Sequence, residues 1–190
     1  MYWVLGVAAA VGVVAWLSSE EQNACAAYNA SSRRLSNETA ERQHQISERL
    51  ANYKKNQDFY THIELHHASH LTASALYQQY SDHKKLVAMF YDKKQQFGRH
   101  IASLKTQFHH AVGIQKEQIK IQLHQMREQF EQAKQQLKIL HELKTELLYE
   151  LRYLNTATRE YKLYIRDNCG QKGQDWYDRG IERKVARCLV

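Results

Sequence analysis

The chain has 190 residues with no proline, seven glycines, and a formal net charge of +7. Because proline and glycine are the residues that break helices, this composition leaves few places for sharp turns and predicts long helices. Its three cysteines (Cys25, Cys169 and Cys188) are odd in number and widely spaced, which excludes a disulfide framework and a zinc-finger spacing. The net positive charge has two interpretations. It favours an anionic partner, or it reflects a solvated helical surface that has more Lys and Arg than Asp and Glu.

An apolar segment opens the chain. Residues 1–17 read MYWVLGVAAAVGVVAWL and carry no charged side chain, and Trp3 and Trp16 stand near the two ends as interfacial aromatics do. We therefore expect a retained single-pass transmembrane anchor in contact with membrane lipid. A cleaved signal peptide lacks its basic n-region here, and a buried core helix is the third alternative. Every Lys and Arg follows the segment, which favours a cytoplasmic body.

A polar, Ser- and Asn-rich stretch follows at residues 18–41. We interpret it as a juxtamembrane linker, either irregular or helical. A helix N-cap is expected at Ser36 or Asn37, because their short polar side chains accept hydrogen bonds from the first turn of a helix.

The body, residues 42–168, carries two blocks of apolar residues spaced alternately by four and three. This period of 3.5 residues, sustained over more than four heptads, is the signature of coiled-coil packing and predicts a self-associating, homo-oligomeric seam. The predicted seam comprises Leu76, Val87, Phe90, Phe97, Ile101, Leu104, Phe108, Ile119, Leu123, Met126, Phe130, Leu137, Leu140, Leu147, Leu151, Leu154, Tyr161 and Ile165.

The two blocks are out of phase by one residue near Gly113. Glycine accepts the backbone angles that an inserted residue requires. Two all-α structures are compatible with the slip: a straight helical rod with a skip or hinge at Gly113, or a helical hairpin that folds there. The apolar stripe between Leu137 and Leu154 is wider than a two-stranded seam, which favours a bundle of three or more helices.

Histidines recur along the body, with His62, His66 and His70 spaced by four. Such spacing places imidazoles on one helix face, where they bind a metal or sense pH, although exposed helices also tolerate histidine as an ordinary polar residue. No acidic residue completes a ligand set, so we expect no metal and no cofactor. Nucleophile motifs and phosphate-binding glycine loops are also missing from the sequence, so we do not expect an enzyme.

The last segment, residues 169–190, departs from the heptad pattern. Gly170 is expected to end the long helix as a C-cap glycine. A short helix follows, with aromatic residues beside basic ones, and it predicts either a docking surface for a partner or a cap that folds back on the coiled coil. The expected partner-binding residues are Trp176, Tyr177, Arg179, Arg183, Lys184 and Arg187. Another protein is favoured over nucleic acid, because acidic residues dilute the charge.

Two functions follow from this architecture. The first is a membrane-anchored coiled-coil scaffold or spacer that assembles with itself and recruits a partner. The second is a membrane-tethered binding module for an anionic partner such as DNA or lipid. In its layout of an anchor followed by a coiled coil, the chain also resembles the inner-membrane spanins of phage lysis, which implies a role in lysis.

Overall fold

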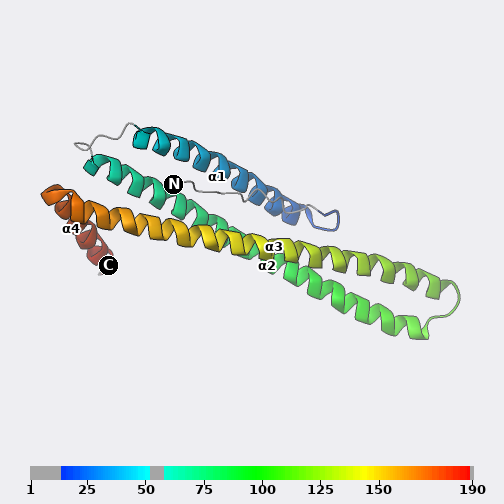
Figure 1. Ribbon diagram of the computed structural model, residues 1–190. Coiled ribbons are helices and arrows are strands. Elements are labelled where there is room, and N and C mark those ends of the chain that lie inside the picture. The colour runs from blue at the N-terminus through cyan, green and yellow to red at the C-terminus, as the bar shows by residue number, and fades with distance from the viewer. Residues whose placement is uncertain (1–13, 52–57, 189–190) are drawn as a thin grey trace. The chain divides into compact units, whose positions relative to one another are not determined.

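A computed structural model describes the backbone of residues 14–51 and 58–188 and their side chains except those of 43, 46–47, 49–50 and 182–188. This part of the chain is all-α, as predicted from its composition. Four helices appear in Figure 1: α1 (Ser19–Ala51), α2 (Asp58–His110), α3 (Ile114–Asn168) and α4 (Gly170–Cys188).

A turn at Gly113 makes α2 and α3 antiparallel neighbours (Figure 1). Gly113 has a φ of 60°, in the left-handed region that glycine adopts without steric cost. On either side of the turn, apolar side chains of the two helices meet in a small core. It consists of Ala111, Ile119 and Leu123, with Ile101, Leu104 and Phe108 packed against them. The hairpin alternative is confirmed, and the straight rod is wrong.

The helices contribute to two compact units, each with a segment of α1, α2 and α3. Unit 1 contains the described residues 34–51, 58–78 and 147–188, and therefore includes α4. Unit 2 contains the described residues 14–33 and 79–146. Its main core consists of Leu17, Cys25, Tyr28, Leu86, Phe90, Leu137, Leu140 and Leu143.

The end of the predicted membrane anchor lies inside unit 2. The backbone N–H of Leu17 donates to the carbonyl of Val14 (3.0 Å) in a turn, and Leu17 is buried. Trp16 was expected at a membrane interface, but its ring packs edge-on against Phe97 (5.0 Å between centroids) and its Nε1–H donates to Gln132 (2.7 Å). For these residues the predicted spanning helix is wrong, because they complete a protein core.

Residues 1–13, the rest of the predicted anchor, lie outside the described residues. No helix of the described segments combines the length and the apolar character that crossing a membrane requires.

The helix α1 begins earlier than the polar sequence suggested. Ser18 Oγ accepts from the backbone N–H of Glu21 (3.3 Å), and the Glu21 carboxylate accepts from the backbone N–H of Ser18 (2.7 Å). This reciprocal pair is a capping box, which satisfies two N–H groups that the first turn leaves unpaired. The N-cap predicted at Ser36 or Asn37 is wrong, since both residues lie within α1. The stretch interpreted as a linker, residues 18–41, forms most of this helix.

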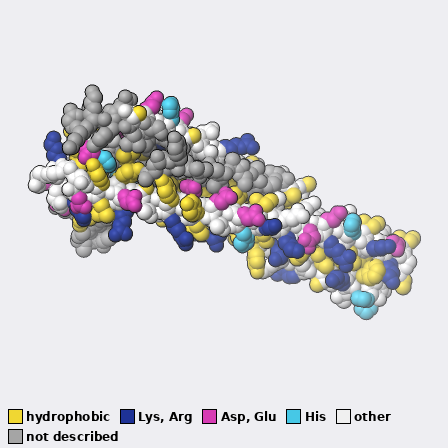
Figure 2. All heavy atoms as spheres, viewed as in Figure 1, with side chains coloured by type: hydrophobic (Ala, Val, Ile, Leu, Met, Phe, Trp, Pro, Cys, Tyr) yellow, Lys and Arg dark blue, Asp and Glu magenta, His cyan; other side chains and the backbone are white. Residues whose placement is uncertain are grey.

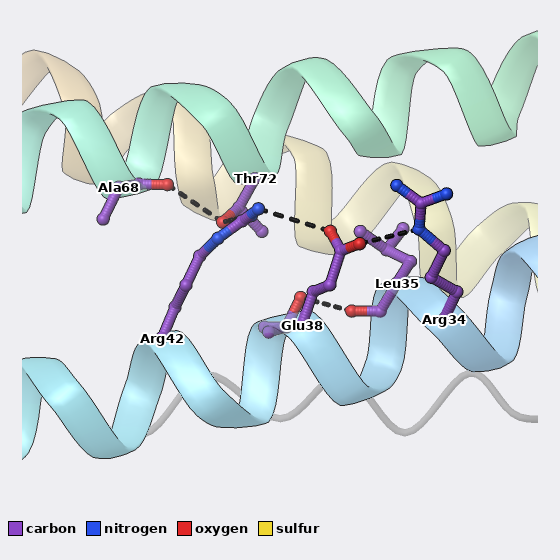
Figure 3. A network of polar contacts seen from close by, with 7 residues as sticks. Arg34, Leu35, Glu38, Arg42, Ala68 and Thr72 are labelled. Carbon is purple, nitrogen blue, oxygen red and sulfur yellow. Dashed lines mark hydrogen bonds and ion pairs between the residues drawn. The ribbon is translucent and has the colours of Figure 1, made fainter.

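Polar contacts join α1 to α2 in unit 1 (Figure 3). The Arg42 guanidinium donates to the hydroxyl of Thr72 (3.1 Å) and to the carboxylate of Glu38 (3.3 Å), which also accepts from Arg34 (2.7 Å). Thr72 in turn donates to the carbonyl of Ala68 (2.9 Å). Thr72 is fully buried, so these bonds satisfy a polar group that would otherwise be costly to remove from water.

The residues of the predicted seam are all buried or half-buried within one chain. Leu76, Leu147 and Leu154 are almost fully covered in unit 1, and Phe90 and Leu140 in unit 2. Heptad periodicity therefore reports packing among the chain's own helices. A second chain is not needed to cover the seam, and self-association stays a prediction.

Candidate functional site

The junction of α3 and α4 depends on two glycines. Gly170 has a φ of 61°, which turns the backbone directly after the last residue of α3 and agrees with its predicted role as a helix stop. Gly173 is buried against the end of α3, and a Cβ at this position would lie 2.0 Å from the carbonyl oxygen of Ile165. Only glycine allows α4 to approach α3 this closely.

Two aromatic side chains attach α4 to the rest of unit 1. The Trp176 ring meets the imidazole of His66 on α2 edge-on, with 5.1 Å between centroids. The Tyr177 ring lies under two cations of α3, with Lys162 Nζ 4.5 Å and Arg166 Cζ 5.2 Å from its centroid. Such cation–π contacts attach the Tyr177 ring to the two cations of α3.

A groove of about 680 Å³ lies between α4 and the two long helices. We call it the α4 groove and define it by His66 and His70 of α2, Arg159, Lys162 and Arg166 of α3, and Trp176 and Tyr177 of α4. Of the described side chains that line it, none is acidic. Its volume falls within the range of small-molecule sites.

The positive charge of the groove comes from α3. Burial, together with His70, Lys162 and His67, lowers the pKa of His66 to about 4, so this imidazole is neutral at pH 7. The Arg166 guanidinium donates two hydrogen bonds to the adjacent Asp167 (2.6 and 2.9 Å), which offsets part of its charge. Lys162 and Arg159 therefore carry the main attraction for an anion.

The predicted partner-binding residues divide into three groups. Trp176 and Tyr177 line the α4 groove, while the exposed Arg179 donates to the carbonyl of Asp175 (3.1 Å). The remaining three, Arg183, Lys184 and Arg187, belong to α4, and their side chains lie outside the described ones. The sequence predicted either a docking surface or a cap that folds back on the coiled coil. This geometry is compatible with both, because α4 folds back on α3 while Trp176 and Tyr177 line a groove.

Sequence reasoning missed the three cations that α3 contributes. Arg159, Lys162 and Arg166 each directly follow a position of the heptad alternation, so they recur on one side of the seam. That spacing was a readable signal, since residues three and four apart share a helix face. It was hidden among the many other basic residues of the body.

The three histidines with a spacing of four lie in two different surroundings. His62 Nδ1 lies 2.8 Å from a carboxylate oxygen of Asp58, and the His62 ring stacks on Tyr164 with 4.0 Å between centroids. His66 and His70 face the α4 groove. Within the described segments, no three His, Cys, Asp or Glu side chains converge in a way that would hold a metal ion.

A buried polar pair lies in the core of unit 2. His83 Nδ1 and the hydroxyl of Tyr28 are 3.1 Å apart, and His83 is completely covered. Its Nε2 has no hydrogen-bond partner among the described atoms. Burial lowers the pKa of His83, because a charged imidazole would lose its hydration. The pair has no access to a groove and serves the core.

Comparison with known proteins yields no relative for this chain. No family model, no curated protein and no solved structure matches it.

Proposed function

We propose that the chain is a helical binding module that takes up an acidic segment of a partner protein in the α4 groove. The observation that carries the proposal is the combination of three cations on one face of α3 with two aromatic rings of α4, in a groove whose described lining is free of acidic side chains. Carboxylates gain from such cations, and the rings give an extended peptide apolar surface to pack against.

A membrane tether belongs to the same proposal. Its support is the sequence of residues 1–13, which is apolar and uncharged. Thirteen helical residues are about 20 Å long, shorter than the roughly 30 Å hydrocarbon core of a bilayer, so with Trp16 and Leu17 packed in unit 2 the tether would enter one leaflet rather than cross the membrane. The tethered module would hold its partner close to the membrane. Self-association receives less support, because the seam that suggested it is covered within one chain.

The groove is tested with a fluorescein-labelled peptide of ten glutamates and the full chain in detergent. Fluorescence anisotropy at low salt should show binding that weakens as salt is added, since exposed charges are screened. Lys162→Glu should weaken binding about tenfold, because Lys162 is half-buried beside Tyr177 and its charge faces the groove.

Lys172→Glu is the matched control. It makes the same charge change in α4, at an exposed position that does not line the groove. Its effect should stay below about twofold, as for a charge at the edge of an interface. Equal losses for the two variants, or no binding by the original chain at low salt, would rule out the groove as the binding site.

A further inference from the structure

The turn between α2 and α3 exposes large aliphatic side chains. Val112 and Ile114 flank Gly113 and are 79% and 81% exposed, and Ile121, two turns into α3, is 59% exposed. Isolated exposed apolar residues are common, but a group of three at the end of one hairpin is typical of an interaction surface. We call these three residues the tip patch.

The core beneath the tip patch is already filled. Ala111, Ile119 and Leu123 are buried, and Ile101, Leu104 and Phe108 pack against them. The tip patch residues alternate with these core positions along the chain and are mostly exposed. Most of their surface lies outside this core, so a polar residue at each position should cost the hairpin little stability.

Basic residues surround the patch. Residues 99–127, which lie within roughly 20 Å of the turn at 1.5 Å per helical residue, contain five Lys and Arg against one acidic residue, Glu117. Glu117 is 3.7 Å from Lys120, whereas Lys116 lies over the ring of Phe108 at 5.0 Å. This short stretch holds a formal charge of +4 out of the +7 of the whole chain. In Figure 2, Lys and Arg mix with hydrophobic side chains at the end of the α2–α3 hairpin.

We infer that the hairpin tip binds the surface of an anionic lipid bilayer, with the tip patch inserted among the headgroups and the surrounding lysines close to lipid phosphates. Exposed aliphatic side chains flanked by Lys and Arg are complementary to the surface of an anionic bilayer, which has apolar acyl chains beneath negatively charged headgroups. Nucleic acid would satisfy the lysines but leave Val112 and Ile114 in water. An acidic peptide needs a groove, and the tip patch is a protruding turn.

The experiment places an environment-sensitive nitrobenzoxadiazole dye at the tip of the full chain. Ile114→Cys carries the dye in a background where Cys25 is alanine and Cys169 and Cys188 are serine. Vesicles of one-third phosphatidylserine in phosphatidylcholine should shift its emission to the blue and raise it about twofold, while pure phosphatidylcholine should have little effect. The readout is local to the tip, so insertion of the N-terminal segment does not produce it.

The same dye at Tyr149→Cys is the matched control, since Tyr149 is 69% exposed and lies in unit 1. Its emission should stay unchanged with both kinds of vesicle. Replacing Val112 and Ile121 by serine should lower vesicle binding of the labelled chain about tenfold, from the lost apolar burial. Replacing Lys105 and Lys116 by glutamate should lower binding to the anionic vesicles more than tenfold, because each basic residue near such a surface adds about fivefold.

Three results would overturn the inference. The first is an unchanged spectrum at position 114 with anionic vesicles. The second is an equal shift at position 149, which would indicate adsorption of the whole chain. The third is an equal shift produced by a DNA duplex, because the tip would then respond to negative charge without lipid.

Discussion

Gly173 offers the sharpest test of how α4 is held. An added Cβ would lie 2.0 Å from the carbonyl oxygen of Ile165 and 3.0 Å from the Cβ of Cys169. An ordinary contact begins near 3.4 Å, so α4 must move by about 1.4 Å in Gly173→Ala to relieve the clash. The obstructing atom belongs to the backbone of α3 and has no rotamer to change.

The cost follows from two opposing effects. The clash at 2.0 Å is with a backbone atom that has no rotamer to change, so its cost lies in the upper part of the range for overpacking, at about 2–3 kcal/mol, while alanine favours the helix over glycine by about 1 kcal/mol. The docked position of α4 should therefore lose about 1–2 kcal/mol, which raises the population of undocked α4 about five- to thirtyfold. Gly180→Ala is the matched control, because nothing lies within 4 Å of a Cβ there.

Hydrogen exchange followed by mass spectrometry on the full chain measures this population. The amides of α4 should exchange about five- to thirtyfold faster in Gly173→Ala and slightly slower in Gly180→Ala, with the rest of unit 1 unchanged. If α4 were protected as well in Gly173→Ala as in Gly180→Ala, the close approach to Ile165 would not be what limits its docking, and the reasoning would fail.

Two further predictions concern α1 and the core of unit 2. Ser18→Ala should lower the free energy of unfolding by about 1 kcal/mol through loss of the capping box, as measured by urea denaturation, whereas Ser19→Ala, one residue into the helix, should change it little. The free energy of unfolding should also fall as the pH is lowered from about 7 to 5. Burial lowers the pKa of His83 below that of the unfolded chain, so the unfolded state takes up protons first over this range. The pKa of His66 is lowered as well, so His83→Leu should reduce the slope in part rather than abolish it. An unchanged slope in His83→Leu would refute a contribution from His83.

Local chemistry was enough to predict much of this protein. The lack of proline and the apolar spacing of 3.5 residues predicted long helices, and the positions facing the core, because a helix buries residues three and four apart on one face. Gly170 was predicted to stop a helix and Gly113 to hold a skip, a hinge or a turn, because glycine tolerates left-handed backbone angles, and both have positive φ. Such features depend on a residue and its near neighbours along the chain.

What covers an apolar stripe is decided by tertiary packing alone. The same heptads suit a partner chain or the chain's own helices, and here α2 and α3 cover each other. Trp16 ends an apolar segment, where a tryptophan at a membrane interface is expected, yet it packs on Phe97. An apolar core and a bilayer both bury the same kind of side chain, so the sequence does not distinguish them. The α4 groove likewise joins residues about a hundred positions apart, His66 and Trp176, whose contact depends on the docking of α4 that Gly173 permits.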